Sequence, residues 1–123
     1  MDKIDELIRK RKLAHKRLQE LRSPVYAAFL EMERATYTDG ALPKKHKELI
    51  AIGIAIVINC ESCMQWHITQ AAEAGATKEE TLEAIEVGIE MGGGPATAYA
   101  RFALEVLERT FGSPLSSEHD AGV

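Results

Sequence analysis

The sequence has little of what marks a secreted, unstructured or membrane-spanning protein. Its 123 residues include only two cysteines and four prolines, too few for a disulfide framework or a proline-rich unfolded chain. The longest apolar run, residues 49–58, is far shorter than the roughly 20 residues that cross a bilayer. The first residues, among them Asp2, Lys3 and Glu6, are charged and lack the apolar segment of a signal peptide. We therefore expect a cytoplasmic protein that has no membrane partner.

A large excess of one charge is also missing. The net charge of −4 gives no basic surplus, so we expect no nucleic-acid partner. Basic side chains gather in residues 1–22 and acidic ones in residues 68–123, and both groups are interpreted as solvated helix faces, including the basic run at residues 9–12. The 46% of hydrophobic residues is enough for one well-packed core.

Apolar residues recur at the three- and four-residue spacing of helices along most of the chain. The β-branched residues at 49–58 would also suit a buried strand. However, the polar residues 44–48 lead into them without a break, and no partner strand exists elsewhere. The sequence therefore predicts an all-α domain of six or seven helices. The expected helices cover residues 3–22, 24–36, 43–58, 60–74, 77–91 and 95–111.

Capping residues mark several of the helix ends. Ser23 and Pro24 suit the N-cap and the first position of the second helix. Thr77 and Glu80 have the spacing of a capping box. Asn59 is expected to cap the helix that follows it, because asparagine is a favoured N-cap residue.

Capping and turn residues of this kind also divide the chain into segments. We expect an N-terminal amphipathic helix in residues 1–22, a helical core in 23–112 and a frayed tail in 113–123. The Gly-Gly-Gly-Pro segment at residues 92–95 separates the last two helices. Its glycines are interpreted as close packing positions, since the lysine and hydroxyl residues of a phosphate loop are missing.

Chemistry-bearing residues gather around the two cysteines. Cys60, Cys63 and His67 are three and four residues apart, so one helix places all three on a single stripe. Two sulfurs at this spacing can form a disulfide where the backbone is favourable. The helix start favours the thiolate of Cys60, and His67 can accept or pass on a proton near neutral pH. A dithiol beside a base suits redox cycling of the two cysteines.

Other interpretations of these residues remain open. Glu48, in the preceding helix, either orients His67 within a proton relay or is an exposed residue of a first helical turn. With Cys60 and Cys63, these two side chains would also make a mixed zinc ligand set. Alternatively, the cysteines are buried apolar residues of a structural helical oligomer. Trp66 is expected to anchor the core or an interface rather than to stack on a substrate.

The pattern of Glu48, Cys60, Cys63 and His67 is more specific than a Cys-x-x-Cys pair alone. Together with residues 71–77 (Ala-Ala-Glu-Ala-Gly-Ala-Thr) and the Gly-Gly-Gly-Pro segment, it resembles the carboxymuconolactone decarboxylase superfamily, in its AhpD-like alkylhydroperoxidase branch. The resemblance extends over about residues 20–111. It implies an all-α fold that assembles as homotrimers or homohexamers, and a thiol-dependent hydroperoxide reductase without a bound cofactor or metal.

The resemblance also implies a role for each residue. Cys63 would be oxidised by the hydroperoxide, Cys60 would close the disulfide, and Glu48 with His67 would relay protons, while a dithiol donor restores the thiols. The family commonly has histidine where this chain has Ser62, which would weaken or alter the peroxidase activity. A thiol–disulfide oxidoreductase without a peroxide substrate is the alternative. The decarboxylase branch does not use a cysteine pair, so decarboxylation is disfavoured.

Overall fold

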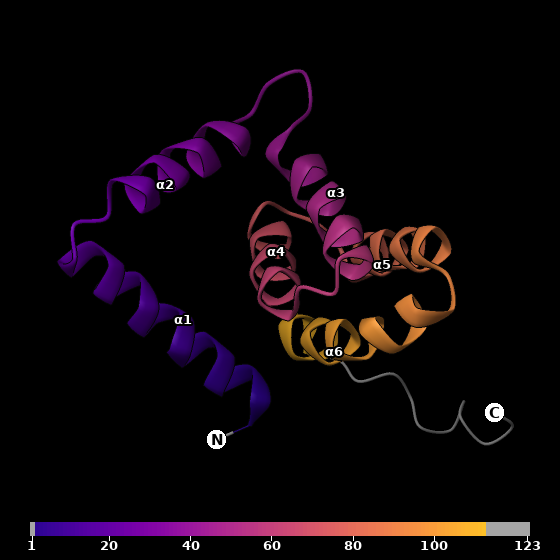
Figure 1. Cartoon of the computed structure of the whole chain (residues 1–123). Coiled ribbons are helices and arrows are strands. Elements are labelled where there is room, and N and C mark those ends of the chain that lie inside the picture. The colour runs from indigo at the N-terminus through magenta and orange to yellow at the C-terminus, as the bar shows by residue number, and fades with distance from the viewer. Residues whose placement is uncertain (1, 113–123) are drawn as a thin grey trace, which may run out of the picture.

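The computed structural model describes residues 2–112, which form six α-helices and no strand (Figure 1). The predicted all-α fold is confirmed. The helices are α1 (Lys3–Glu20), α2 (Pro24–Thr36), α3 (Lys44–Val57), α4 (Glu61–Glu73), α5 (Lys78–Gly92) and α6 (Gly94–Phe111). The tail predicted at residues 113–123 lies outside the described residues.

Most of the predicted helix ends are found in the structure. The Ser23 hydroxyl accepts a hydrogen bond from the Tyr26 amide at 3.1 Å, and Pro24 opens α2. Thr77 and Glu80 form the reciprocal capping box of α5, with bonds of 3.0 and 2.9 Å. These local side-chain bonds satisfy amides that have no partner inside the helix.

The prediction that Asn59 caps α4 is wrong. Asn59 adopts a left-handed conformation with φ of +55°, and Cys60 is the N-cap residue. The chain has to reverse within residues 58–60 between α3 and α4, and asparagine tolerates the left-handed region better than most residues. The correction matters because it moves Cys60 to the very start of the helix, with Cys63 in the first turn.

The core lies among α3, α4, α5 and α6. Ile52 and Ile56 from α3 are fully buried with Met64 and Ile68 from α4 and Ile85 from α5. The pairs α3–α4, α3–α5, α5–α6 and α4–α6 are all in contact. This bundle fixes α3 against α4; α3 carries Glu48, α4 carries Cys63 and His67, and Cys60 is the N-cap residue of α4.

Glycines allow the closest approach within the bundle. A Cβ atom on Gly88 of α5 would lie 2.7 Å from both the Gly53 oxygen and the Ile56 Cβ of α3. Gly92 also packs closely, since a Cβ there would lie 2.6 Å from the Ala96 side chain. Gly93 instead supplies a positive φ of +73° between α5 and α6. Close packing thus explains the first glycine of the Gly-Gly-Gly-Pro segment and a turn explains the second.

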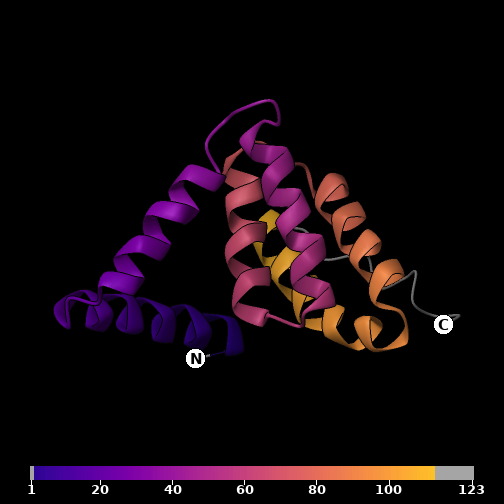
Figure 2. The same cartoon turned by 45° about the horizontal axis from the view of Figure 1, so that its top comes forward.

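Helices α1 and α2 form an arm that stands away from the bundle (Figures 1 and 2). No residue of α2 is buried, and Ile4 is the only buried residue of α1. Ion pairs hold the start of the arm in place, from Arg109 of α6 to Asp2 and Asp5. Within residues 2–112, no helix is long and apolar enough to cross a membrane.

Candidate active site

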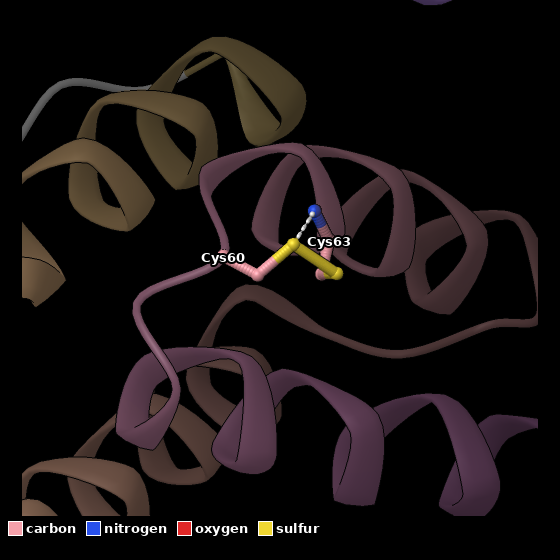
Figure 3. Close-up of a disulfide and its surroundings, with 2 residues drawn as sticks. All are labelled: Cys60 and Cys63. Atoms are coloured by element: carbon pink, nitrogen blue, oxygen red, sulfur yellow. Dashed lines mark hydrogen bonds between the residues drawn. A yellow bond between two sulfur atoms is a disulfide. The ribbon is translucent and has the colours of Figure 1, made fainter.

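The two cysteines are joined as a disulfide at the start of α4 (Figure 3). Their Cα atoms are 5.2 Å apart, within the range that a disulfide requires. The Cys63 amide donates a hydrogen bond to the Cys60 sulfur at 3.1 Å, drawn as the dashed line in Figure 3. Cys60 therefore caps the helix with its sulfur, as serine or aspartate would cap others. In the reduced protein, this amide and the positive end of the helix favour a thiolate at Cys60.

Glu48 and His67 meet across the contact between α3 and α4. Glu48 is only 1% exposed, and its Oε1 lies 2.7 Å from His67 Nδ1. Its other oxygen accepts a hydrogen bond from Lys44 Nζ at 2.8 Å, and the same ammonium group lies 3.1 Å from the Gln70 side-chain oxygen. Glu48 is thus buried in contact with His67, and the alternative of an exposed glutamate is wrong.

The electrostatics of this pair fix the proton positions. Burial raises the pKa of Glu48, but the hydrogen bonds from His67 and Lys44 outweigh burial and hold the pKa below its ordinary value. Glu48 is therefore a carboxylate at neutral pH, which makes His67 Nδ1 the donor in their bond. Nε2 of His67 is then the nitrogen that is able to exchange a proton with the surroundings.

Tyr37 covers the histidine on another side. Its ring centroid lies 5.2 Å from that of His67. Burial raises the pKa of Tyr37, and the charges of Glu48 and Glu33 raise it further, so the phenol remains protonated at neutral pH. Tyr37 thus presents a neutral ring to His67.

A cavity of about 390 Å³ opens between the arm and α4. Cys63 and His67 line it, together with Ser62 and Trp66 of the same helix, whereas Cys60 is not part of its wall. The residues contributed by the arm are Arg11, Lys12, His15, Tyr26, Phe29, Leu30 and Glu33. Of the two cysteines, Cys63 therefore lines the cavity, in a wall that it shares with His67.

Comparison with known proteins shows where this arrangement belongs. The model of the carboxymuconolactone decarboxylase family matches residues 23–106. The chain belongs to the carboxymuconolactone decarboxylase family. "Uncharacterized protein 4 in cox locus" of Paracoccus denitrificans is 43% identical over 86 residues, which are 70% of this chain and 78% of the relative. An uncharacterized protein of Cupriavidus necator is 42% identical over 78 residues, 63% of this chain and 69% of that protein.

Solved structures of the family share the fold. Apo-lpg0406, a carboxymuconolactone decarboxylase family protein from Legionella pneumophila, superposes with a TM-score of 0.83 at 32% identity, over 90% of this chain and 99% of that one. TM1620 of Thermotoga maritima superposes with a TM-score of 0.78 at 25% identity, over 85% and 91% of the two chains. The family resemblance inferred from the cysteine motif is thereby confirmed.

The four predicted site residues form two pairs instead of one ligand set. The sulfurs of Cys60 and Cys63 bond each other, and Glu48 bonds His67. Within residues 2–112, no group of three or more histidine, cysteine or acidic side chains is arranged to hold a metal ion. The cysteine pair is compatible with redox chemistry.

Several residues around the site were not predicted from the sequence, or were predicted to lie elsewhere. Arg11 was assigned to a solvated face, yet one of its guanidinium nitrogens is buried. Trp66 was expected to be an anchor, yet it is 36% exposed and lines the cavity. Tyr37 was not considered, and Lys44 only as part of a polar helix start. The four-residue spacing of Lys44 and Glu48 was the one signal that pointed to their contact.

Proposed function

We propose that this chain is a thiol-dependent hydroperoxide reductase in which Cys60 and Cys63 cycle between dithiol and disulfide. The observation that carries the proposal is the position of Cys63. Cys63 lines a cavity that His67 also lines, and His67 is hydrogen-bonded to the buried carboxylate of Glu48. A nucleophile, a base and a group that orients the base are thus assembled at one opening.

The proposed reaction gives each of the four residues a role. Glu48 orients His67, which takes the proton of the Cys63 thiol through Nε2. The Cys63 thiolate attacks one peroxide oxygen, the O–O bond breaks, and the alcohol leaves with the returned proton. Cys60 then displaces hydroxide from the Cys63 sulfenic acid, which yields water and the disulfide. An external dithiol of the reducing cytoplasm restores both thiols.

Cysteine substitution and mass spectrometry test the proposal. We expect one equivalent of cumene hydroperoxide to remove about 2 Da from the reduced protein as the disulfide closes. Cys63→Ser should stop peroxide consumption, whereas Cys60→Ser should gain about 16 Da as a trapped sulfenic acid. Glu86→Gln, an exposed change on α5, is the control and should react normally. Peroxide turnover by Cys63→Ser would overturn the role assignment.

The test also separates the alternative activity. A reduced protein that ignores hydroperoxides but exchanges with small disulfides would be a thiol–disulfide oxidoreductase without a peroxide substrate. A protein whose thiols react with neither would be a structural member of the family.

We further propose that the chain works as a homo-oligomer. A groove of about 540 Å³ runs between α3 and α5, and its wall is almost wholly apolar. Ile50, Ile54, Val87 and Met91 line it with side chains that are each more than half exposed. Clustered apolar side chains of this kind mark an association surface. A trimer or hexamer, as the resemblance implies, would cover this groove.

A further inference from the structure

One arginine of α1 is held in an unusual environment. The Arg11 guanidinium lies over the Trp66 ring, with its Cζ atom 5.2 Å from the ring centroid. Its Nη1 atom is buried and has no hydrogen-bond partner within residues 2–112. Burial lowers the pKa of Arg11, because the charged form loses contact with water. A buried donor without an acceptor is destabilising, and a water molecule or a ligand in the cavity can supply the acceptor that the described residues do not.

Two other arginines of the chain, by comparison, are paired with glutamates. Arg9 is exposed and donates two hydrogen bonds to Glu6, at 2.5 and 3.2 Å. Arg34 on α2 pairs with Glu31 in the same manner, at 2.5 and 3.0 Å. Among the described residues, Arg11 has no carboxylate within ion-pair distance. Arg11, which lines the cavity, therefore has no ion-pair partner among them.

The other residues of the cavity wall indicate the chemical character of the ligand. Phe29, Leu30, Tyr26 and Trp66 give the wall an apolar and aromatic character. Lys12 and His15 add basic groups, and Glu33 is the only carboxylate among the described lining residues. The volume of about 390 Å³ lies within the usual range of small-molecule sites. A ligand that satisfies both parts of this wall is apolar along its length and anionic at one end.

We propose that the cavity binds an amphipathic hydroperoxide whose carboxylate pairs with Arg11 while its apolar body contacts Phe29 and Trp66. This inference rests on the proposed function and names its substrate class. The guanidinium fork matches a carboxylate geometrically, and the aromatic rings contact the hydrocarbon part. The peroxide group is thereby directed to Cys63, the cysteine that lines the same cavity.

The carboxylate takes no part in the chemistry. The Cys63 thiolate bonds to one peroxide oxygen and the O–O bond breaks, so that the hydroperoxide carboxylate becomes a hydroxy carboxylate. Cys60 and Cys63 supply the two electrons and end as the disulfide, with one water released. Arg11 is a positioning residue, and its removal should change substrate preference without removing the reaction.

Binding of an unreactive analogue tests the inference apart from activity. Trp66 is the only tryptophan of the chain, so its fluorescence reports on the cavity. We expect 4-isopropylbenzoate to bind the oxidised protein about 10- to 100-fold more tightly than neutral 4-isopropylbenzamide, as for a hydrogen bond to a charged group. Arg11→Met keeps the apolar stem over Trp66 and should abolish the difference. Arg9→Met, on the same helix, is the matched control and should retain it.

Turnover gives the second measurement. The wild-type protein should reduce para-carboxycumene hydroperoxide with a higher kcat/KM than its methyl ester, by the same factor. Arg11→Met should lose this preference, so that its kcat/KM values for the acid and the ester become equal. Equal binding of benzoate and benzamide by the wild-type protein would overturn the inference, as would an equal loss for both substrates in Arg11→Met. Charge-dependent binding without turnover of either hydroperoxide would instead overturn the proposed function and the substrate assignment, leaving a carboxylate site.

Discussion

Glu48 has two separable roles in this structure, and two substitutions divide them. Glu48→Ala removes the buried acceptor of both His67 and Lys44. The His67 side chain is only 12% exposed, so the loss of its charged partner costs about 2–3 kcal/mol. The Lys44 side chain is 36% exposed and turns to water and Gln70, which limits its share to about 1 kcal/mol. We expect a total loss of about 3–4 kcal/mol.

The expected loss is large enough to measure by thermal unfolding. For a chain of 123 residues, a change of 1 kcal/mol shifts Tm by about 4 °C. Glu48→Ala should therefore lower Tm by about 12–16 °C. Glu48→Gln keeps an oxygen acceptor for the His67 Nδ1 hydrogen and fills the same space, so its Tm should fall by no more than about 4 °C.

The effect of Glu48→Gln on activity should be large, in contrast to its small effect on stability. The amide of Glu48→Gln holds the imidazole in place but supplies no negative charge when His67 takes the thiol proton. We expect oxidation of the reduced protein by hydroperoxide to slow by about 100-fold or more, measured as the rate of thiol loss. Glu86→Gln, an exposed change on α5, is the control and should alter neither rate nor Tm. A wild-type rate in Glu48→Gln would refute the relay, and an unchanged Tm in Glu48→Ala would refute the buried-acceptor argument.

Three further predictions concern packing, pH and assembly. Gly88→Ala places a Cβ 2.7 Å from the Gly53 oxygen and should lower Tm by about 8 °C, whereas Gly94→Ala meets nothing within 4 Å and should lie within about 2 °C of wild type. The lowered pKa of Glu48 stabilises the fold above the unfolded pKa of about 4.3, and this contribution is lost as the pH falls through the lower folded value. The difference in Tm between wild type and Glu48→Gln should therefore persist above pH 5 and shrink below pH 4, and a constant difference would contradict the assignment. Ile54→Asp places a charge in the apolar groove and should yield monomers by light scattering at a concentration where wild type is oligomeric, and an unchanged mass would exclude this face.

Local signals explain how much of the fold was predictable. Capping by Ser23 and Thr77 depends on residues that are neighbours in sequence, so the pattern alone located those helix ends. Cys63 and His67 lie one turn apart on α4, as the helical spacing predicts, whereas Cys60 is the N-cap residue that precedes the helix. The reversal at Asn59 was missed because asparagine suits both an N-cap and a left-handed turn. Only the length of the α3–α4 connection decides between them.

Contacts between helices were less accessible from sequence. The bond between Glu48 and His67 requires the packing of α3 on α4, which no spacing within one helix specifies. The cavity requires the placement of an arm whose second helix buries no residue. Arg11 lies in a run of four basic residues, and only docking of α1 over Trp66 distinguishes it from Arg9.

The positions of the two cysteines also reconcile two different expectations about which of them is the reactive thiolate. The helix start favours the thiolate at Cys60, whereas the resemblance assigns the peroxide to Cys63. In the structure the Cys60 sulfur accepts the Cys63 amide hydrogen, and Cys63 is the cysteine that lines the cavity. On the proposed function these positions are complementary, because a stabilised thiolate is the better leaving group when a donor opens the disulfide. The donor would then attack Cys63 through the opening that admits the peroxide, and Cys60 would depart as the thiolate that the helix end stabilises.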